Sequence, residues 1–386
     1  MRLRHTGGTT VHLGYCTNVH PAQDLPGIVA QLDTYAVPVR ERLGADVLGL
    51  GLWLAAPVAA GLAEDPGAVG RLRAELSSRG LEVVTLNGFP YQAFHAPVVK
   101  REVYHPDWTT AERLSYTLNL ARILVGLLPA DAARGSVSTL PLAWRTPWDA
   151  NRAERCARTL EALATGLARL ERRTGRTVRV GFEPEPGCVI ENTRQAVTHL
   201  SNVDTEYLGI CLDLAHLACA WEEPGQAVAA LHAAGLPVVK VQVSAALAST
   251  APAMDAGALR EYVEPRFLHQ TRGRDGLATD DLDEALAAPP TGEPWRVHYH
   301  VPLHAPPVPP LRSTVDVLRD GLRAVLGGDR PHCDHLDVET YTWNVLPARR
   351  RPGTADQLAE GIAAELAFAR AELVGLGLRD RTGVAA

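Results

Sequence analysis

Short apolar runs alternate with longer amphipathic stretches along almost the whole chain, and this alternation constrains the fold most. The apolar runs lack a polar–apolar alternation, which is typical of parallel strands buried on both faces. Eight strand–helix units predict an α/β fold, a closed (β/α)8 or TIM barrel. The expected strands are 11–16, 46–54, 81–87, 135–141, 177–183, 208–214, 236–244 and 334–341, and the expected helices are 24–43, 66–79, 107–128, 148–173, 192–201, 224–234, 313–326 and 354–375.

An open, doubly wound sheet is the alternative to a barrel. Such a sheet usually has a glycine-rich phosphate-binding turn after its first strand. The sequence there is GYCTNVHP, and no GxGxxG or P-loop motif occurs anywhere in the chain. We therefore expect a single barrel domain over residues 1–386. The segment 245–312 is too long for a plain connection, so we expect an insertion after the seventh strand that folds over the barrel mouth.

Composition limits the partners and the compartment. The chain has 386 residues, 46% of them hydrophobic, and a formal net charge of −6, which makes nucleic acid an unlikely partner. No uncharged apolar stretch is long enough to span a membrane, and the first residues lack the apolar core of a secretory signal. The six cysteines are scattered without a CxxC pair, which favours a reduced, cytoplasmic protein.

Polar side chains that could bind a metal follow nearly every predicted strand, where barrel enzymes build their sites. Taken singly, each is more often a core residue, a helix cap or an ion-pair partner; it is the whole set that indicates a site. Its members are Asn18 and His20 after the first strand, Asn87 and His95 after the third, Glu183 and Glu185 after the fifth, Asp213 and His216 after the sixth, Gln242 on the seventh, and Glu339 on the eighth.

Convergence of these carboxylates and histidines would be electrostatically unfavourable, because too few Lys or Arg residues accompany them. A divalent cation would relieve the repulsion, and mixed carboxylate and imidazole ligands suit Zn, Mn, Co, Ni or Fe. In the stretch GFEPEPG we expect Glu183 to be a ligand, held by a loop that Pro184 and Pro186 stiffen. Glu185, one residue beyond Pro184, should point elsewhere and act behind the ligands or structurally.

The stretch WRVHYHVPL within the predicted insertion places two histidines on one face. Because side chains alternate along an extended strand, His298 and His300 share a face and Tyr299 lies on the other. We expect this strip to bring His298 to the substrate and His300 to the metal. The alternative is an exposed edge with solvated histidines, in which Val297, Tyr299 and Val301 form the buried side.

Three strand-end motifs resemble those of the xylose-isomerase-like barrels, the group that holds sugar isomerases, sugar epimerases and endonuclease IV. They are RVGFEPEPG, ICLDLAHLA and LDVETY, and the resemblance covers about residues 10 to 375. It implies that Glu183, Asp213 and Glu339 are metal ligands and that His216 belongs to the metal or substrate shell. The seventh strand departs from the family, which usually has His where this chain has Gln242.

Six longer stretches resemble the EboE-like branch of this group, called metabolite traffic proteins. They are GYCTNVHP, TLNGFPYQAFH, SVSTLP, GFEPEPG, ICLDLAHLA and VQVSAAL. The resemblance implies a gene cluster that moves or processes a metabolite, and other proteins of that cluster as partners. It names no reaction.

The leading functional hypothesis is a metal-dependent isomerase or epimerase that acts on a small hydroxylated or carbonyl compound. Glu183 and Glu339 would be ligands that also act as bases, with His216 beside them. The residues Asn18, His20, Asn87, His95 and His298 would contact the substrate, and Glu183, Asp213, Gln242, His300 and Glu339 would hold the metal. The alternatives are a metal-dependent phosphoesterase of the endonuclease IV type and a non-catalytic metal-containing carrier.

Overall fold

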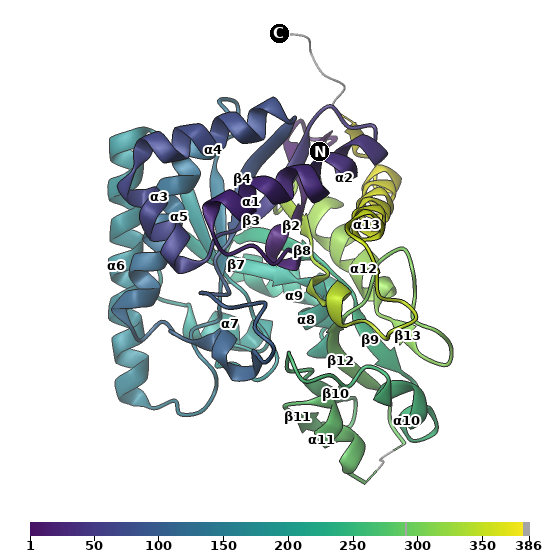
Figure 1. Cartoon of the computed structure of the whole chain (residues 1–386). Helices are drawn as coiled ribbons and strands as arrows, with labels where there is room; N and C mark the ends of the chain where they lie inside the picture. The colour runs from purple at the N-terminus through teal and green to yellow at the C-terminus, as the bar shows by residue number, and fades with distance from the viewer. Residues whose placement is uncertain (290–291, 381–386) are drawn as a thin grey trace.

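The computed structural model describes residues 1–289 and 292–380, so residues 381–386 of the predicted domain lie outside it. Within the described residues, parallel strands form a closed barrel surrounded by helices (Figure 1). The barrel closes because β14 pairs in parallel with both β8 and β2. This confirms the predicted TIM barrel and excludes the open sheet. The barrel strands are β2 (Thr10–Cys16), β3 (Leu48–Trp53), β4 (Leu81–Asn87), β5 (Gly135–Thr139), β6 (Val178–Phe182), β7 (Leu208–Asp213), β8 (Val238–Val243) and β14 (His335–Val338).

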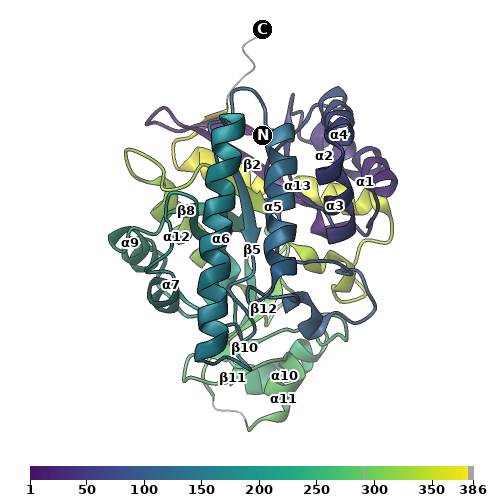
Figure 2. The ribbon, with the colours of Figure 1, turned by 90° about the vertical axis from the view of Figure 1, so that its left-hand side faces the viewer.

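Most of the predicted helices pack around the barrel, and the long helices α5 and α6 stand side by side outside β5 (Figure 2). The α6 helix begins where the Asp149 side chain accepts a hydrogen bond from Arg152 N, and it ends at Gly175, whose φ of 68° favours glycine. Sequence patterns missed α3 and α8. The helices are α1 (Leu25–Gln31), a π-helical turn (Leu32–Ala36), α2 (Val37–Arg42), α3 (Ala56–Glu64), α4 (Pro66–Ser78), α5 (Ala111–Leu127), α6 (Ala150–Thr174), α7 (Thr193–His199), α8 (Leu214–Cys219), α9 (Pro224–Ala233), α12 (Val315–Leu326) and α13 (Ala355–Gly375).

The chain between β8 and β14 forms a second, antiparallel sheet rather than the irregular segment that the sequence suggests. Its strand order is β11-β10-β12-β9-β13 within the described part of the chain. Two helices accompany it, and Figure 1 shows these elements below the barrel, at the end away from the N-terminus. Its elements are β9 (Ala246–Ser249), α10 (Pro252–Arg260), β10 (Thr271–Gly273), β11 (Ala278–Thr279), α11 (Leu282–Ala287), β12 (Trp295–His300) and β13 (Arg312–Ser313).

The barrel interior carries a buried ion pair one layer below the strand ends. Lys240 Nζ on β8 lies 2.9 Å from Asp337 Oδ2 on β14, and both side chains are almost fully buried. Gly51 makes room for this pair, because a Cβ atom there would lie 1.8 Å from Asp337 Oδ2. The next inward-facing residues on these two strands, Gln242 and Glu339, therefore stand above a charged and tightly packed floor.

Short strands and turns complete the ends of the chain. β1 (Arg2–Arg4) pairs antiparallel with β2 and with β15 (Arg379–Asp380). After β14, the 3-10 helix η4 (Tyr341–Val345) leads toward α13. Among the described helices, none combines the length and the apolar character that crossing a membrane requires.

Candidate metal centre

Three carboxylates meet at the carboxyl ends of the barrel strands. Glu183 follows β6, Asp213 ends β7 and Glu339 follows β14, and their exposed fractions are only 3%, 1% and 5%. Glu183 Oε2 and Asp213 Oδ2 have no hydrogen-bond partner. Burial, together with the charges of Glu339 and Asp213, raises the pKa of Glu183 well above its usual value. Buried acceptor atoms without partners are energetically costly. A cation between these carboxylates would remove both the cost and the repulsion.

Neighbouring side chains orient one oxygen of two of these carboxylates. Asp213 Oδ1 accepts hydrogen bonds from His216 N and from Ser244 Oγ, each at 2.8 Å. Glu339 Oε1 accepts from Asn18 Nδ2 at 2.8 Å and from Asn87 Nδ2 at 3.0 Å. The two asparagines, predicted as substrate contacts, thus hold Glu339 in place. They also line a cavity at this end of the barrel.

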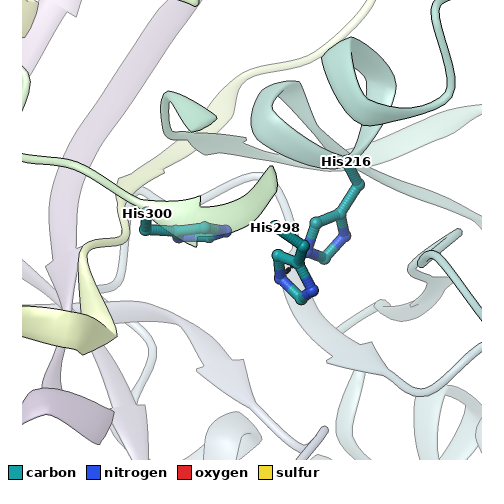
Figure 3. Close-up of side chains that lie close together, drawn as sticks. All are labelled: His216, His298 and His300. Carbon is teal, nitrogen blue, oxygen red and sulfur yellow. Dashed lines mark hydrogen bonds between the residues drawn. The ribbon is translucent and has the colours of Figure 1, made fainter. Parts of the chain in front are cut away.

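Three histidine rings stand next to the carboxylates and point toward one another (Figure 3). His216 comes from α8, and His298 and His300 come from β12 of the second sheet. All three are buried, with exposed fractions of 4% or less, which excludes the alternative of a solvated histidine edge. The second sheet therefore brings two imidazoles to the end of the barrel at which the carboxylates lie.

The partners of the Nδ1 atoms define the state of each ring. His216 Nδ1 lies 2.9 Å from Pro184 O, and His300 Nδ1 lies 2.7 Å from Glu339 O. A carbonyl oxygen only accepts, so both Nδ1 atoms carry the proton. His298 Nδ1 donates in the same way to Gln270 Oε1 at 2.7 Å. The three Nε2 atoms are consequently free lone pairs, as in most metal-binding histidines.

Two of these Nε2 atoms face each other. His216 Nε2 and His298 Nε2 are 2.9 Å apart, and His300 Nε2 has no hydrogen-bond partner. Burial lowers the pKa of His216 to about 4 and the pKa of His298 well below its usual value, so both rings are neutral at pH 7. At this separation the two nitrogens need either a proton on one of them or a cation beside both.

The ligand atoms form three overlapping groups among the described residues. In each group all atoms lie within 4.8 Å of one another. Asp213 belongs to two groups, and His300 Nε2 lies 3.8 Å from Asp213 Oδ2, which links the carboxylates to the histidines. The donor set therefore fits divalent cations, with room for more than one. The groups are Glu183, Asp213 and His216; Asp213, His300 and Glu339; and His216, His298 and His300.

Gln242 stands beside Asp213 in the register of the sheet. Its side chain is fully buried, yet neither Oε1 nor Nε2 has a hydrogen-bond partner. An amide with both polar atoms unpaired in a barrel interior is unfavourable. A cation next to Oε1 would give one of these two atoms a partner. The predicted ligand role of Gln242 is compatible with this arrangement.

Two residues predicted to contact the substrate do not lie on the cavity wall. His20 stacks on Tyr35, with ring centroids 4.1 Å apart, and its Nε2 lies 3.0 Å from Tyr15 Oη. His95 Nε2 lies 2.7 Å from Asn18 O, behind the side chain that holds Glu339. Each histidine follows a barrel strand, but its ring packs against neighbouring groups instead of lining this cavity, and its contact with a substrate stays a prediction.

Sequence reasoning missed the residues that orient His298. Gln270 Nε2 donates to Tyr104 Oη at 2.9 Å, and Tyr104 Oη donates to Glu185 Oε1 at 2.7 Å. Burial raises the pKa of Glu185 to about 8, against the lowering effect of the Tyr104 hydrogen bond. Glu185 Oε1 also lies 3.7 Å from His298 Nδ1, and its side chain lines the same cavity as Glu183, although the sequence predicts that it points elsewhere. Its partners come from distant loops, and no local signal marks them.

A cavity opens above the cluster and contains about 520 Å³ of space not filled by atoms, part of it open to solvent. Its polar end consists of two asparagines, three glutamates and three histidines: Asn18, Asn87, Glu183, Glu185, Glu339, His216, His298 and His300. Its other end is built from apolar and aromatic side chains, among them Phe89, Phe94 and Phe267. A small molecule in this cavity would reach the cluster directly.

Comparison with known proteins agrees with this architecture. The chain belongs to the xylose isomerase-like TIM barrel family, which matches residues 41–278. A xylose isomerase-like TIM barrel protein from Mycobacterium smegmatis, solved in complex with magnesium, has 15% identity and a TM-score of 0.52, covering 94% of this chain and 98% of its own. D-allulose 3-epimerase from Methylomonas sp., in complex with D-allulose, has 12% identity and a TM-score of 0.50, covering 94% and 97%. At these identities the solved structures show the fold alone. No curated protein matches the chain.

Proposed function

We propose that this protein is a divalent-metal-dependent isomerase or epimerase that acts on a small hydroxylated or carbonyl metabolite. One observation carries the proposal: three carboxylates and three imidazoles converge at the carboxyl ends of the barrel strands, and several of their acceptor atoms are unpaired. Membership of a family that includes sugar isomerases supports it. So do the folds of a sugar epimerase and of a magnesium-bound relative.

Glu183, Asp213 and Glu339 would hold one ion, with Gln242 as a fourth ligand. His216, His298 and His300 would hold a second ion next to it. Zn, Mn, Co, Ni and Fe suit such mixed ligands. When bound, a divalent ion supplies Lewis acidity, which polarises the oxygens of a carbonyl or hydroxyl compound.

The protein's own groups would position the substrate and move the proton. Glu183 Oε2 has no hydrogen-bond partner, so it can accept a proton from a substrate carbon next to a carbonyl. Glu339 would return a proton from the other side, because Asn18 and Asn87 fix its Oε1 and leave Oε2 for the exchange. The buried cavity would limit the access of water during this transfer.

On the resemblance to the EboE-like branch, we propose that the substrate is a metabolite that a gene cluster processes. We propose other proteins of that cluster as partners and the cytoplasm as the compartment. Co-purification of this chain with the products of adjacent genes would test the first point.

Deuterium exchange tests the activity directly. The protein, loaded with Mn²⁺ or Zn²⁺, is incubated in D2O with a panel of hydroxy ketones and hydroxy aldehydes. NMR should show loss of the carbon-bound proton next to the carbonyl and formation of an isomer or epimer. Treatment with EDTA should stop the exchange. Absence of exchange over a broad panel with fully loaded protein would contradict the proposal.

Phosphoester hydrolysis is the second candidate, because the three-histidine group offers a position for a second ion. Two ions about 3.5 to 4 Å apart are typical of metal-dependent phosphoesterases. Bis-(p-nitrophenyl) phosphate hydrolysis without isomerisation would favour this candidate. Loaded protein that performs neither reaction would be assigned to the non-catalytic carriers.

A further inference from the structure

The apolar half of the cavity is built around three aromatic rings. Phe94, Phe267 and Tyr341 line it and contact one another. Their ring centroids are 5.1 Å (Phe94–Phe267), 5.0 Å (Phe267–Tyr341) and 5.9 Å (Phe94–Tyr341) apart. These rings come from the loop after β4, the segment before β10 and η4. Such spacings are typical of aromatic rings that pack on one another, so the cavity wall here is a continuous aromatic surface.

This aromatic cluster begins where the metal ligands end. The Tyr341 ring lies 4.8 Å from the His300 ring and 6.1 Å from the His298 ring, measured between centroids. If the oxygens of a bound molecule lie at the histidines and carboxylates, the atoms next to those oxygens must therefore contact the aromatic rings.

The cavity has no free positive charge for a phosphate group. Lys100 is the only Lys or Arg among the described residues that line it. Its ammonium group is paired with Asp281 and donates to Phe267 O at 2.8 Å. Glu183, Glu185 and Glu339 line the same space. A phosphorylated tail would meet carboxylates and aromatic faces, with no unpaired side-chain donor of the kind that phosphate requires.

We propose that Phe94, Phe267 and Tyr341 form a subsite for an aromatic ring, so that the substrate is an aryl-bearing hydroxy-carbonyl compound rather than a free sugar or a sugar phosphate. This inference rests on the proposed function, because it takes the oxygen-binding end from the metal centre. The physical reason is that a free sugar carries a hydroxyl on nearly every carbon. Hydroxyls against these rings would lose their hydrogen bonds to water without replacement.

Three hydroxamates with the same metal-binding head test the subsite. Acetohydroxamate has a methyl tail, benzohydroxamate a phenyl tail, and gluconohydroxamate a sugar-like tail. Their affinities for the metal-loaded protein are measured by calorimetry and corrected for their affinities for the free metal ion. We expect benzohydroxamate to bind at least about tenfold more tightly than the other two, from the apolar area that the ring buries. Equal binding, or a preference for gluconohydroxamate, would overturn the inference.

Variants assign the effect to the rings. Phe94→Ala and Phe267→Ala should each reduce the ratio of benzohydroxamate to acetohydroxamate affinity at least about threefold, with little change for acetohydroxamate. Phe368→Ala on α13 is the matched control, because this phenylalanine is outside the cavity lining. If an alanine variant does not fold, the leucine variant at the same position keeps the volume but removes the ring. An unchanged ratio in folded variants would contradict the assignment.

A metal-free measurement separates this inference from the proposed function. If the purified protein binds no divalent metal, the proposed function fails and the hydroxamates lose their anchor. Saturation-transfer NMR with benzyl alcohol and glycerol then tests the subsite alone. Binding of benzyl alcohol but not glycerol, reduced in Phe94→Ala and Phe267→Ala, would support the subsite without the metal. Absence of benzyl alcohol binding would reject it.

Discussion

At the scale of single residues, the carboxylates could be predicted from the sequence and the state of the histidines could not. Glu183, Asp213 and Glu339 each end a buried apolar run, and the topology of a barrel brings strand ends together. The proton positions on His216 and His300 depend instead on Pro184 O and Glu339 O, which the fold supplies from other strands. Local patterns contain no information about such partners.

The GFEPEPG loop offers a matched pair of variants. Glu183→Gln should lower the affinity for divalent metal by about tenfold to a hundredfold, because it replaces a charged ligand by a neutral one. Glu185→Gln, two residues along the same loop, should change the metal content little, since Glu185 belongs to none of the ligand groups. Metal analysis and isothermal titration measure both. The opposite ranking of the two variants would contradict the assignment.

Glu82 gives a pH-dependent prediction at the other end of the barrel. Burial raises its pKa, but hydrogen bonds from His12 and Arg2 outweigh burial and lower it to about 2. A lowered carboxyl pKa contributes stability above the unfolded value, about pH 4.3, and this contribution is lost as the pH falls toward 2. The shift corresponds to about 3 kcal/mol of unfolding free energy at pH 7.

Glu82→Gln should therefore be less stable than the wild type at pH 7, by up to about 3 kcal/mol, and more nearly equal to it at pH 3. Urea unfolding at both pH values measures the difference. Glu64→Gln on the exposed surface of α3 is the control and should have little effect at either pH. Because the folded pKa is about 2, part of the deficit should remain at pH 3. A Glu82→Gln deficit of the same size at pH 7 and pH 3 would argue for a packing effect rather than a charge effect.

At the scale of elements, long amphipathic helices and apolar strands could be predicted, and short or featureless elements could not. The run LGICLDLAHLACA is apolar except for Asp213 and His216, so no period marks the change from β7 to α8. The strands of the second sheet are two to six residues long, too short to produce a pattern. β12 is the longest of them, and its alternation predicts that His298 and His300 share a face. Their burial came from pairing with β9 and β10.

β12 carries the prediction for this scale. The double variant His298→Ala/His300→Ala should lose at least one bound metal ion per chain, because it removes two of the three imidazoles of one group. Circular dichroism should show an intact barrel. The matched control is His232→Ala/His332→Ala, an exposed pair with ring centroids 5.3 Å apart. Unchanged metal content and ligand binding in a folded β12 variant would remove these histidines from the centre.

At the scale of the whole molecule, the proposed metal centre joins the barrel to the second sheet. Its proposed ligands come from β7, β8, α8, β12 and the residues that follow β6 and β14. Binding of a ligand to the folded state alone stabilises it by about 2.7 kcal/mol at a concentration one hundred times the dissociation constant. We therefore expect metal removal to affect the stability of the entire chain as well as the site.

The dependence of this stabilisation on pH follows from the carboxylates. Burial raises the pKa of Glu183 and Glu339 and raises that of Glu185 to about 8 in the metal-free protein. A raised carboxyl pKa contributes stability that is complete below about pH 4.3 and is lost as the pH rises through the folded value. His216 and His298 are neutral when folded but still bind protons up to about pH 7.5 when unfolded, which adds an opposing slope. This slope is common to the metal-free and the metal-loaded protein and cancels when the two are compared.

Between pH 6.5 and 8, the metal-free protein should lose up to about 1.4 kcal/mol of stability per pH unit for each proton that the folded carboxyls retain. Metal binds the deprotonated carboxylates, so the difference in unfolding free energy between the loaded and the EDTA-treated protein should widen over the same range. Comparing these two forms cancels groups far from the site, such as the buried amino terminus. Denaturant unfolding at pH 6.5, 7.2 and 8 measures the difference, and the Glu183→Gln variant should show a smaller widening. A difference that stays constant with pH would mean that these carboxylates are already ionised without metal, and that another charge in the barrel, with Lys240 the nearest candidate, balances them.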